Sequence, residues 1–152
     1  MPQIYAYRCT RCDLALRSGW GGSMYVLDDT GQRVICPHPG EYFVAGLVLG
    51  FSRDEAAAAH LHVDLVKKWW WSPRKRREFE ERVKLLISLT GFLTDMVCCD
   101  CQSEFSIDLT RDVRECPTCH STNVFSVTKM PGKQCPACKL GEIIEIDTGM
   151  VS

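Results

Sequence analysis

Residues 98–119 have the sequence CCDCQSEFSIDLTRDVRECPTC. This stretch contains two Cys-x-x-Cys pairs, Cys98 with Cys101 and Cys116 with Cys119, and fourteen residues separate them. A Cys-x-x-Cys pair at a tight turn presents both sulfurs on one side, so two pairs can surround a metal ion at about 2.3 Å per bond. The segment 105–109 alternates apolar and polar residues, which is typical of a strand. The stretch therefore predicts a small β lobe that is held together by a metal.

Two further Cys-x-x-Cys pairs lie near the ends of the chain, Cys9 with Cys12 and Cys135 with Cys138, and Cys36 and Cys99 lie outside the pairs. Fifteen residues separate Cys119 from Cys135, so spacing alone does not decide which pairs share a metal. The strand and turn signals around residues 105–128 favour one site made by Cys98, Cys101, Cys116 and Cys119.

Three segments resemble known zinc-binding families. Residues 95–129 resemble the zinc-ribbon superfamily in their order of knuckle, hairpin, knuckle and strand. Residues 134–146 are similar to half of a ribbon of the kind appended to topoisomerases. The opening of the chain, from Tyr5 to Cys12, resembles the start of small regulatory zinc-ribbon proteins of the FmdB type. These resemblances imply structural zinc ions in small antiparallel lobes.

The pair Cys9 and Cys12 has two candidate partners. Downstream, Cys36-Pro37-His38-Pro39 departs from a normal second knuckle, because a proline stands where the second cysteine is expected. Either Cys36 and His38 complete a local site with the first pair, or Cys135 and Cys138 complete a site that ties the two ends of the chain together. We favour the local site, which gives three metal sites if the last pair finds other partners, whereas end-to-end pairing gives two.

Composition places these thiols in a reducing compartment. The chain has ten cysteines in 152 residues, and its first residues show no secretory signal, so we expect a cytoplasmic protein. Closely spaced cysteines in the cytosol bind metal more often than they form disulfides. Zinc is the expected ion, although four thiolates also suit iron. The longest apolar run, 42–51, is too short to span a membrane.

The distribution of cysteines predicts an α+β protein with three segments. Residues 1–41 and 97–152 are expected to form small zinc-ribbon lobes of antiparallel strands, with hairpin strands at 23–27 and 32–35. Residues 42–96 lack cysteine and predict a central helical hairpin or bent helix. One helix should begin after a capping box at Ser52 and run to about Trp70, and another should run from Ser72-Pro73 to about Gly91.

Besides the cysteine pairs, the sequence has one more feature that suggests a binding function: residues 67–77 are rich in lysine and arginine and contain three consecutive tryptophans. Tryptophan faces can stack on bases while cations hold phosphates, which would make a nucleic-acid surface. However, consecutive helical residues point about 100° apart, so three tryptophans in a row cannot form one platform. The alternatives are a buried core with a solvated face, or a surface that binds a protein. The candidate partner-binding residues are Lys67, Lys68, Trp70, Trp71, Arg74, Lys75, Arg76 and Arg77.

No catalytic triad, phosphate loop or pair of catalytic carboxylates is evident, and thiolates in a closed site leave zinc no open position. We therefore expect a non-catalytic zinc-binding adaptor or regulatory protein that contacts other proteins, and we expect neither membrane association nor a small-molecule substrate. A regulator that binds nucleic acid is the alternative, and a rubredoxin-like electron carrier or redox sensor is a weaker one.

Overall fold

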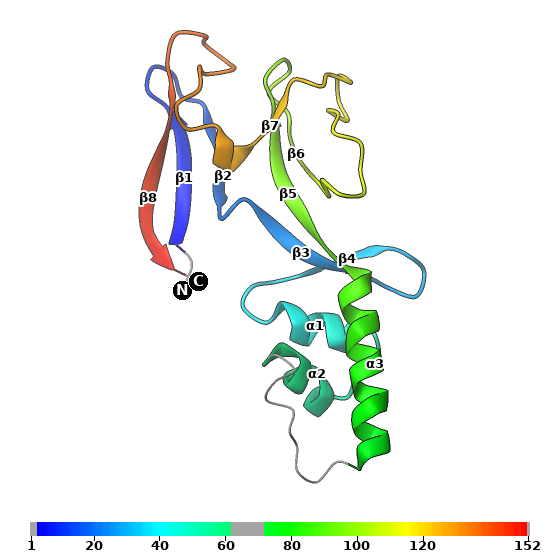
Figure 1. Ribbon diagram of the computed structural model, residues 1–152. Helices are drawn as coiled ribbons and strands as arrows, with labels where there is room; N and C mark the ends of the chain where they lie inside the picture. Colours follow the sequence, from blue (N-terminus) through cyan, green and yellow to red (C-terminus); the bar gives the residue numbers. More distant parts are fainter. Residues whose placement is uncertain (1–2, 62–71, 152) are drawn as a thin grey trace. The chain divides into compact units, whose positions relative to one another are not determined.

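The computed structural model describes residues 3–61 and 72–151 (Figure 1). Within these residues, three α-helices and two β-sheets of antiparallel strands form an α+β fold, as the sequence predicts. The helices are α1 (Glu41–Val48), α2 (Arg53–His60) and α3 (Pro73–Leu89), with a short 3-10 helix η2 (Val127–Lys129). The strands are β1 (Gln3–Cys9), β2 (Ala15–Gly19), β3 (Gly22–Leu27), β4 (Arg33–Cys36), β5 (Thr90–Cys98), β6 (Glu104–Ile107), β7 (Val124–Ser126) and β8 (Ile143–Val151).

Contacts divide the chain into two compact units. One consists of Met1–Gly22 together with Phe92–Ser152, and the other is Ser23–Gly91. We call the first the terminal unit and the second the helical unit. The predicted division at 41/42 and 96/97 follows composition, whereas the units follow pairing, because β1 at the start of the chain pairs with β8 near its end.

The terminal unit is built on a three-stranded sheet with β1 between β2 and β8. Both pairings are antiparallel, with Tyr7 opposite Leu16 on one side and opposite Glu145 on the other. Tyr7, Leu16 and Ile143 are buried in one apolar cluster, so this sheet has a genuine core face. The core holds together two segments that are more than a hundred residues apart in sequence.

The rest of the terminal unit is a second set of antiparallel strands. β5 pairs with β6 on one side and with β7 on the other, so that Met96 lies opposite both Phe105 and Ser126. Met96, Ile107 and Val124 are buried together with two cysteines of this region. This core is small, as is usual for a lobe that a bound metal would stabilise.

The helical unit contains the β3–β4 hairpin and the three helices. The hairpin has the predicted strands, with Tyr25 opposite Ile35 and a turn that begins at Asp28. The Ser52 capping box is present, and the Ser72 side chain caps the start of α3. Figure 1 shows α1 and α2 beside α3, and buried Phe51, Phe79 and Leu86 belong to their shared core.

Some helix limits differ from the sequence prediction. The helix expected to run to Trp70 ends as α2 at His60, and residues 62–71 lie outside the described part of the chain. α3 ends at Leu89, and Gly91 belongs to β5 instead of terminating the helix. α1 was not predicted separately; it packs closely on α2 because Gly46 faces Ala56, where an added Cβ would lie 3.1 Å from the alanine Cβ.

None of the helices in the described part of the chain combines the length and the apolar composition needed to cross a membrane.

Candidate metal centres

Four of the five cysteines of residues 98–119 form one compact tetrad, which we call site 2. Its sulfurs belong to Cys98, Cys101, Cys116 and Cys119, and they all lie within 4.8 Å of one another. Cys98 ends β5, and the second pair lies in the loop between β6 and β7. The Cys98 and Cys119 sulfurs are 3.5 Å apart, as are those of Cys101 and Cys116. The four residues expected to share a site therefore lie together.

The remaining two pairs form a second tetrad, site 1, which joins the ends of the chain. It consists of Cys9, Cys12, Cys135 and Cys138, again with all sulfurs within 4.8 Å. Cys9 is 3.6 Å from Cys138, and Cys12 is 3.7 Å from Cys135. The pairing of β1 with β8 places Cys9 opposite Ile143, directly after the loop that carries the last pair. The sheet thus brings the two halves of site 1 together.

The local site favoured from the sequence, with Cys36 and His38, is not the arrangement in the structure. Cys36 is 1% exposed and packs in the core of the helical unit, with its sulfur directed to the Val34 carbonyl oxygen. Burial raises the pKa of the Cys36 thiol. The His38 ring instead pairs with the Glu41 carboxylate. Among the described residues, the only two groups that could hold a metal are site 1 and site 2.

Cys99 and His120, which lie beside site 2 cysteines in the sequence, are not ligands in either tetrad. Cys99 is half-buried against the apolar cluster of the terminal unit. The His120 Nδ1 lies 2.7 Å from a Glu115 carboxylate oxygen. Both lie in knuckle turns.

All four knuckles share one backbone pattern. In each, the amide of the first cysteine donates to a carbonyl five or six residues later: Leu14, Ser103, Ser121 and Gly141 accept from Cys9, Cys98, Cys116 and Cys135. In three knuckles the residue after the second cysteine has a positive φ, namely Gln102, His120 and Lys139. Non-glycine residues adopt this conformation rarely, so the fold of the knuckle imposes it. The pattern turns both sulfurs of each pair to one side.

Backbone amides also point at the sulfurs of site 1. The Arg11 amide lies 3.3 Å from the Cys9 sulfur, and the Gly141 amide lies 3.4 Å from the Cys138 sulfur. Such donors stabilise thiolates over thiols. Gly141 also makes room for the opposite knuckle, because a Cβ at this position would lie 2.5 Å from the Cys9 sulfur.

Within each tetrad the thiols differ in acidity. Hydrogen bonds with the side chain and the backbone of Ser103 lower the pKa of Cys101 to about 6, and the Leu140 and Gly141 amides lower the pKa of Cys138 to about 6. The Leu14 amide acts to lower the pKa of Cys12, but burial and the neighbouring thiols raise it to about 12. Each tetrad thus contains one thiol whose pKa lies well below the ordinary value.

The donor set fits a tetrahedral metal. Four sulfurs at about 2.3 Å from a central ion lie about 3.8 Å from one another, close to the 3.5–3.7 Å between neighbouring sulfurs in the two tetrads. Zinc and iron both accept four thiolates, so either could be held. Each site would use all four protein ligands, which is the pattern of a structural site.

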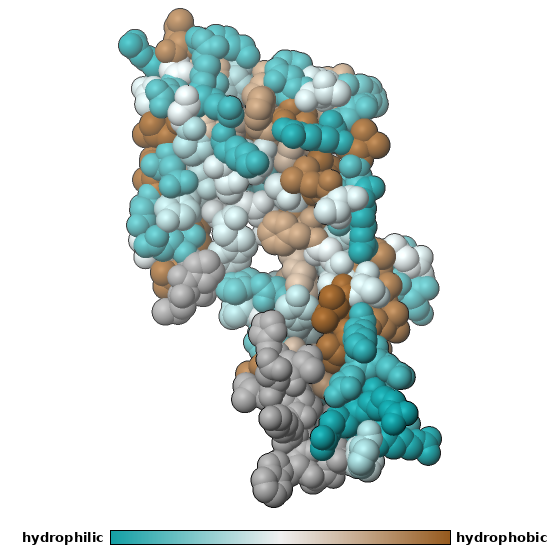
Figure 2. All heavy atoms as spheres, viewed as in Figure 1, coloured by the Kyte–Doolittle hydropathy of each residue, from teal (hydrophilic) through white to brown (hydrophobic). Residues whose placement is uncertain are grey.

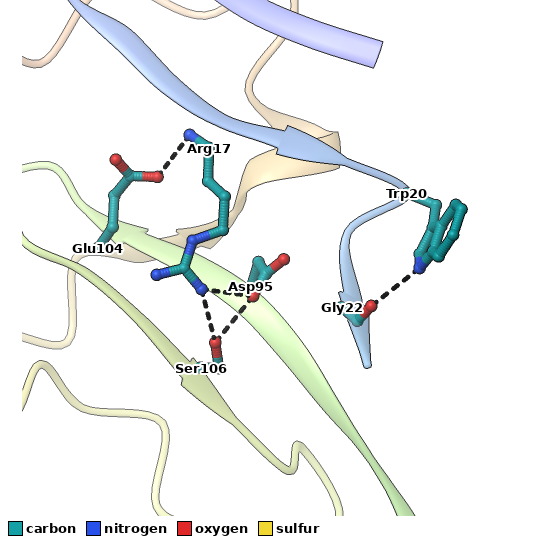
Figure 3. A network of polar contacts seen from close by, with 6 residues as sticks. All are labelled: Arg17, Trp20, Gly22, Asp95, Glu104 and Ser106. Atoms are coloured by element: carbon teal, nitrogen blue, oxygen red, sulfur yellow. Dashed lines mark hydrogen bonds and ion pairs between the residues drawn. The ribbon is translucent and has the colours of Figure 1, made fainter. Parts of the chain in front are cut away.

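A polar network that the sequence did not indicate connects β2, in the sheet that carries site 1, with β5 and β6, the strands next to site 2. The Arg17 amide on β2 donates to Glu104 on β6, and its guanidinium reaches Asp95 on β5 at 3.2 Å (Figure 3). Ser106 on β6 donates to the same Asp95 carboxylate. The network links the sheet of site 1 with the strands of site 2. Single charged residues far apart in sequence gave no signal for this contact.

The predicted partner-binding segment is only partly described. Lys67, Lys68, Trp70 and Trp71 lie outside the described residues. Arg74, Lys75, Arg76 and Arg77 lie exposed in the first turns of α3, where Figure 2 shows a hydrophilic surface. The Arg74 Nε lies 2.8 Å from a Glu78 carboxylate oxygen, so part of this charge is balanced on the helix itself.

No protein-family model, no curated protein and no solved structure matches this chain. The two tetrads are consistent with zinc-ribbon-like motifs, and their geometry is therefore the main guide to function.

Proposed function

We propose that the chain is a cytoplasmic, non-catalytic zinc-binding protein that acts as an adaptor or regulator through contacts with other proteins. The observation that carries this proposal is the use of eight of the ten cysteines in two complete tetrads within one unit. A zinc ion with four protein thiolates has no position for water or substrate, so it stabilises a fold and activates nothing.

Charge favours a protein partner over nucleic acid for the terminal unit. The sequence of this unit has eight lysines and arginines against ten aspartates and glutamates, a net charge of −2. Each zinc ion with four thiolates adds a further net charge of about −2, so the loaded unit is strongly acidic. Phosphate backbones are repelled by such a surface. A nucleic-acid role would have to rest on the helical unit and its basic residues.

Exposed apolar side chains give the terminal unit a surface suited to protein contacts. Leu140, in the last knuckle of site 1, is 82% exposed, and Val113, in the loop that carries the second pair of site 2, is 77% exposed. Figure 2 shows apolar residues interspersed with hydrophilic ones on this unit. Contacts of this kind contribute more to protein interfaces than to nucleic-acid binding.

The test is recovery of a partner from the cells that make the protein, after nuclease treatment and at about 50 mM and about 300 mM salt. The proposal predicts the same co-purified protein at both salt concentrations. It also predicts that Leu140→Ser loses this protein while both metals are retained. Ile87→Ser changes an equally apolar, 55% exposed residue of α3 and serves as the matched control.

The nucleic-acid alternative predicts a different result: no protein co-purifies after nuclease treatment, and the chain binds DNA or RNA directly at the lower salt concentration but not at the higher one. A red, redox-active iron protein would support the electron carrier.

A further inference from the structure

Lys139 connects the two metal sites although it is a ligand of neither. It follows Cys138 in the last knuckle of site 1, and its Nζ donates to the Cys99 carbonyl oxygen at 3.2 Å. Cys99 lies between Cys98 and Cys101, the first knuckle of site 2. One side chain therefore reaches from the loop of one tetrad to the backbone of the other.

The backbone of Lys139 is held by the knuckle of site 1. Its φ is +57°, its amide donates to the Cys135 carbonyl oxygen at 3.1 Å, and its own carbonyl accepts from the Gln134 side chain at 2.6 Å. A positive φ is unfavourable for lysine, so the conformation depends on the turn around it. A metal at site 1 would fix this turn and with it the start of the Lys139 side chain.

The other end of the contact lies in the turn that presents two ligands of site 2. The Cys99 amide donates to the Asn123 carbonyl oxygen at 2.9 Å. Next to it, Asp100 accepts hydrogen bonds from the Ser121 hydroxyl and from the Asn123 side chain. These bonds and the charge of Lys139 hold the pKa of Asp100 below its ordinary value. The first knuckle of site 2 is thus tied both to its own second knuckle and to site 1.

Electrostatics gives the contact a second effect. Two zinc ions with four thiolates each would be two neighbouring groups of net charge about −2, which repel each other. Lys139 brings a cation to the backbone between the ligands of site 2 while belonging to site 1. It therefore offsets the repulsion that the second metal complex would meet.

We infer that Lys139 is a positioning residue for site 2, through which metal binding at site 1 raises the metal affinity of site 2. The inference rests on the proposed metal binding and adds to it a coupling between the sites. Ordering of the last knuckle at site 1 prepares the Cys98–Cys101 turn, so the second metal meets a site that is already arranged.

The experiment is a zinc titration of the reduced, full-length protein, with site occupancy followed separately by protection from iodoacetamide. Protection of Cys101 and Cys119, the two exposed sulfurs of site 2, reports that site, and protection of Cys12 and Cys138 reports site 1. We expect Lys139→Met to weaken zinc binding at site 2 about tenfold or more, the usual effect of removing a group that orients ligands.

Two variants separate positioning from general loss of charge or fold. Lys139→Arg keeps the donor and the charge and should keep most of the affinity of site 2. Lys129→Met removes an exposed lysine of η2 in the same unit and should bind as the unchanged protein does. Cys135→Ser/Cys138→Ser removes half of site 1 and should weaken site 2 to a similar degree, and adding Lys139→Met to it should have little further effect.

The coupling is refuted if site 2 binds zinc equally well in the unchanged protein, in Lys139→Met and in the variant without site 1. If Lys139→Met does not fold, the comparison between the unchanged protein and the double cysteine variant still decides. Independent loading of both sites overturns only the coupling, whereas failure of either tetrad to bind any metal overturns the proposed function itself.

Discussion

Removal of the last cysteine pair should release the two ends of the chain from each other. The variant Cys135→Ser/Cys138→Ser takes away half of site 1, where a bound metal would cross-link residues 123 and 129 positions apart. The matched variant Cys116→Ser/Cys119→Ser takes away half of site 2, where the linked residues are only 15 and 21 positions apart. Each variant removes one fully buried cysteine and one more accessible one.

Loop-closure entropy gives the size of the effect. In the chain-entropy model, a cross-link that closes a loop of 123 residues stabilises the folded chain by about 5 kcal/mol at 25 °C. A cross-link that closes a loop of 15 residues contributes about 3 kcal/mol. Site 1 should therefore contribute about 2 kcal/mol more than site 2, and its loss should act on the β1–β8 pairing, which it holds.

Hydrogen exchange followed by mass spectrometry measures this effect strand by strand in the zinc-loaded proteins. Without site 1, amides of β1 and β8 should exchange faster by up to a few thousandfold, the factor that corresponds to about 5 kcal/mol. Without site 2, the faster exchange should appear in β6 and β7. The account of site 1 is refuted if β1 and β8 exchange no faster in the first variant than in the second.

Three further predictions concern a single glycine, pH and a helix cap. Gly141→Ala would place a methyl group 2.5 Å from the Cys9 sulfur, so it should weaken zinc binding at site 1 by about 1–3 kcal/mol. The control Gly149→Ala strains a positive φ of +69° but adds its methyl group in open space, so it should leave zinc affinity unchanged. Equal zinc affinity of the two variants in a chelator competition would contradict this prediction. Zinc affinity should fall as the pH falls, because the metal displaces thiol protons. Below about pH 6, where Cys101 and Cys138 also become protonated, the slope of the logarithm of affinity against pH should increase by one proton per site. A slope that stays constant through this range in cobalt titrations would count against the thiolate assignment. Ser52→Ala removes the oxygen that accepts a hydrogen bond from the Glu55 amide, so it should lower the free energy of unfolding of the helical unit by about 1 kcal/mol. Urea unfolding followed by circular dichroism measures this loss. An unchanged midpoint of the urea transition would show that the cap is not stabilising.

Local sequence patterns predicted the parts of this protein that are fixed locally. The knuckles, the β3–β4 hairpin and the starts of α2 and α3 depend on residues within a few positions of one another, such as Ser52 with Glu55. Site 2 was also predicted, because its two pairs are close in sequence and strand signals accompany them.

The partners of Cys9 and Cys12 could not be decided in the same way. They depend on the register of β1 with β8, and no local pattern encodes a pairing across more than a hundred residues. Cys36 was a candidate ligand because, together with His38, it could complete a local site with the first cysteine pair. Its place at the buried end of β4 instead makes it a core residue. Lys139 had no signal of its own, since its contact with Cys99 exists only once both knuckles are folded.

The most direct test of the two-site account is native mass spectrometry of the purified, reduced protein with metal analysis of the same sample. The account predicts two metal ions per chain, one remaining after Cys135→Ser/Cys138→Ser and two remaining after Cys36→Ser. Three ions in the unchanged protein with one lost on substitution of Cys36, or a folded chain that binds no metal at all, would contradict it.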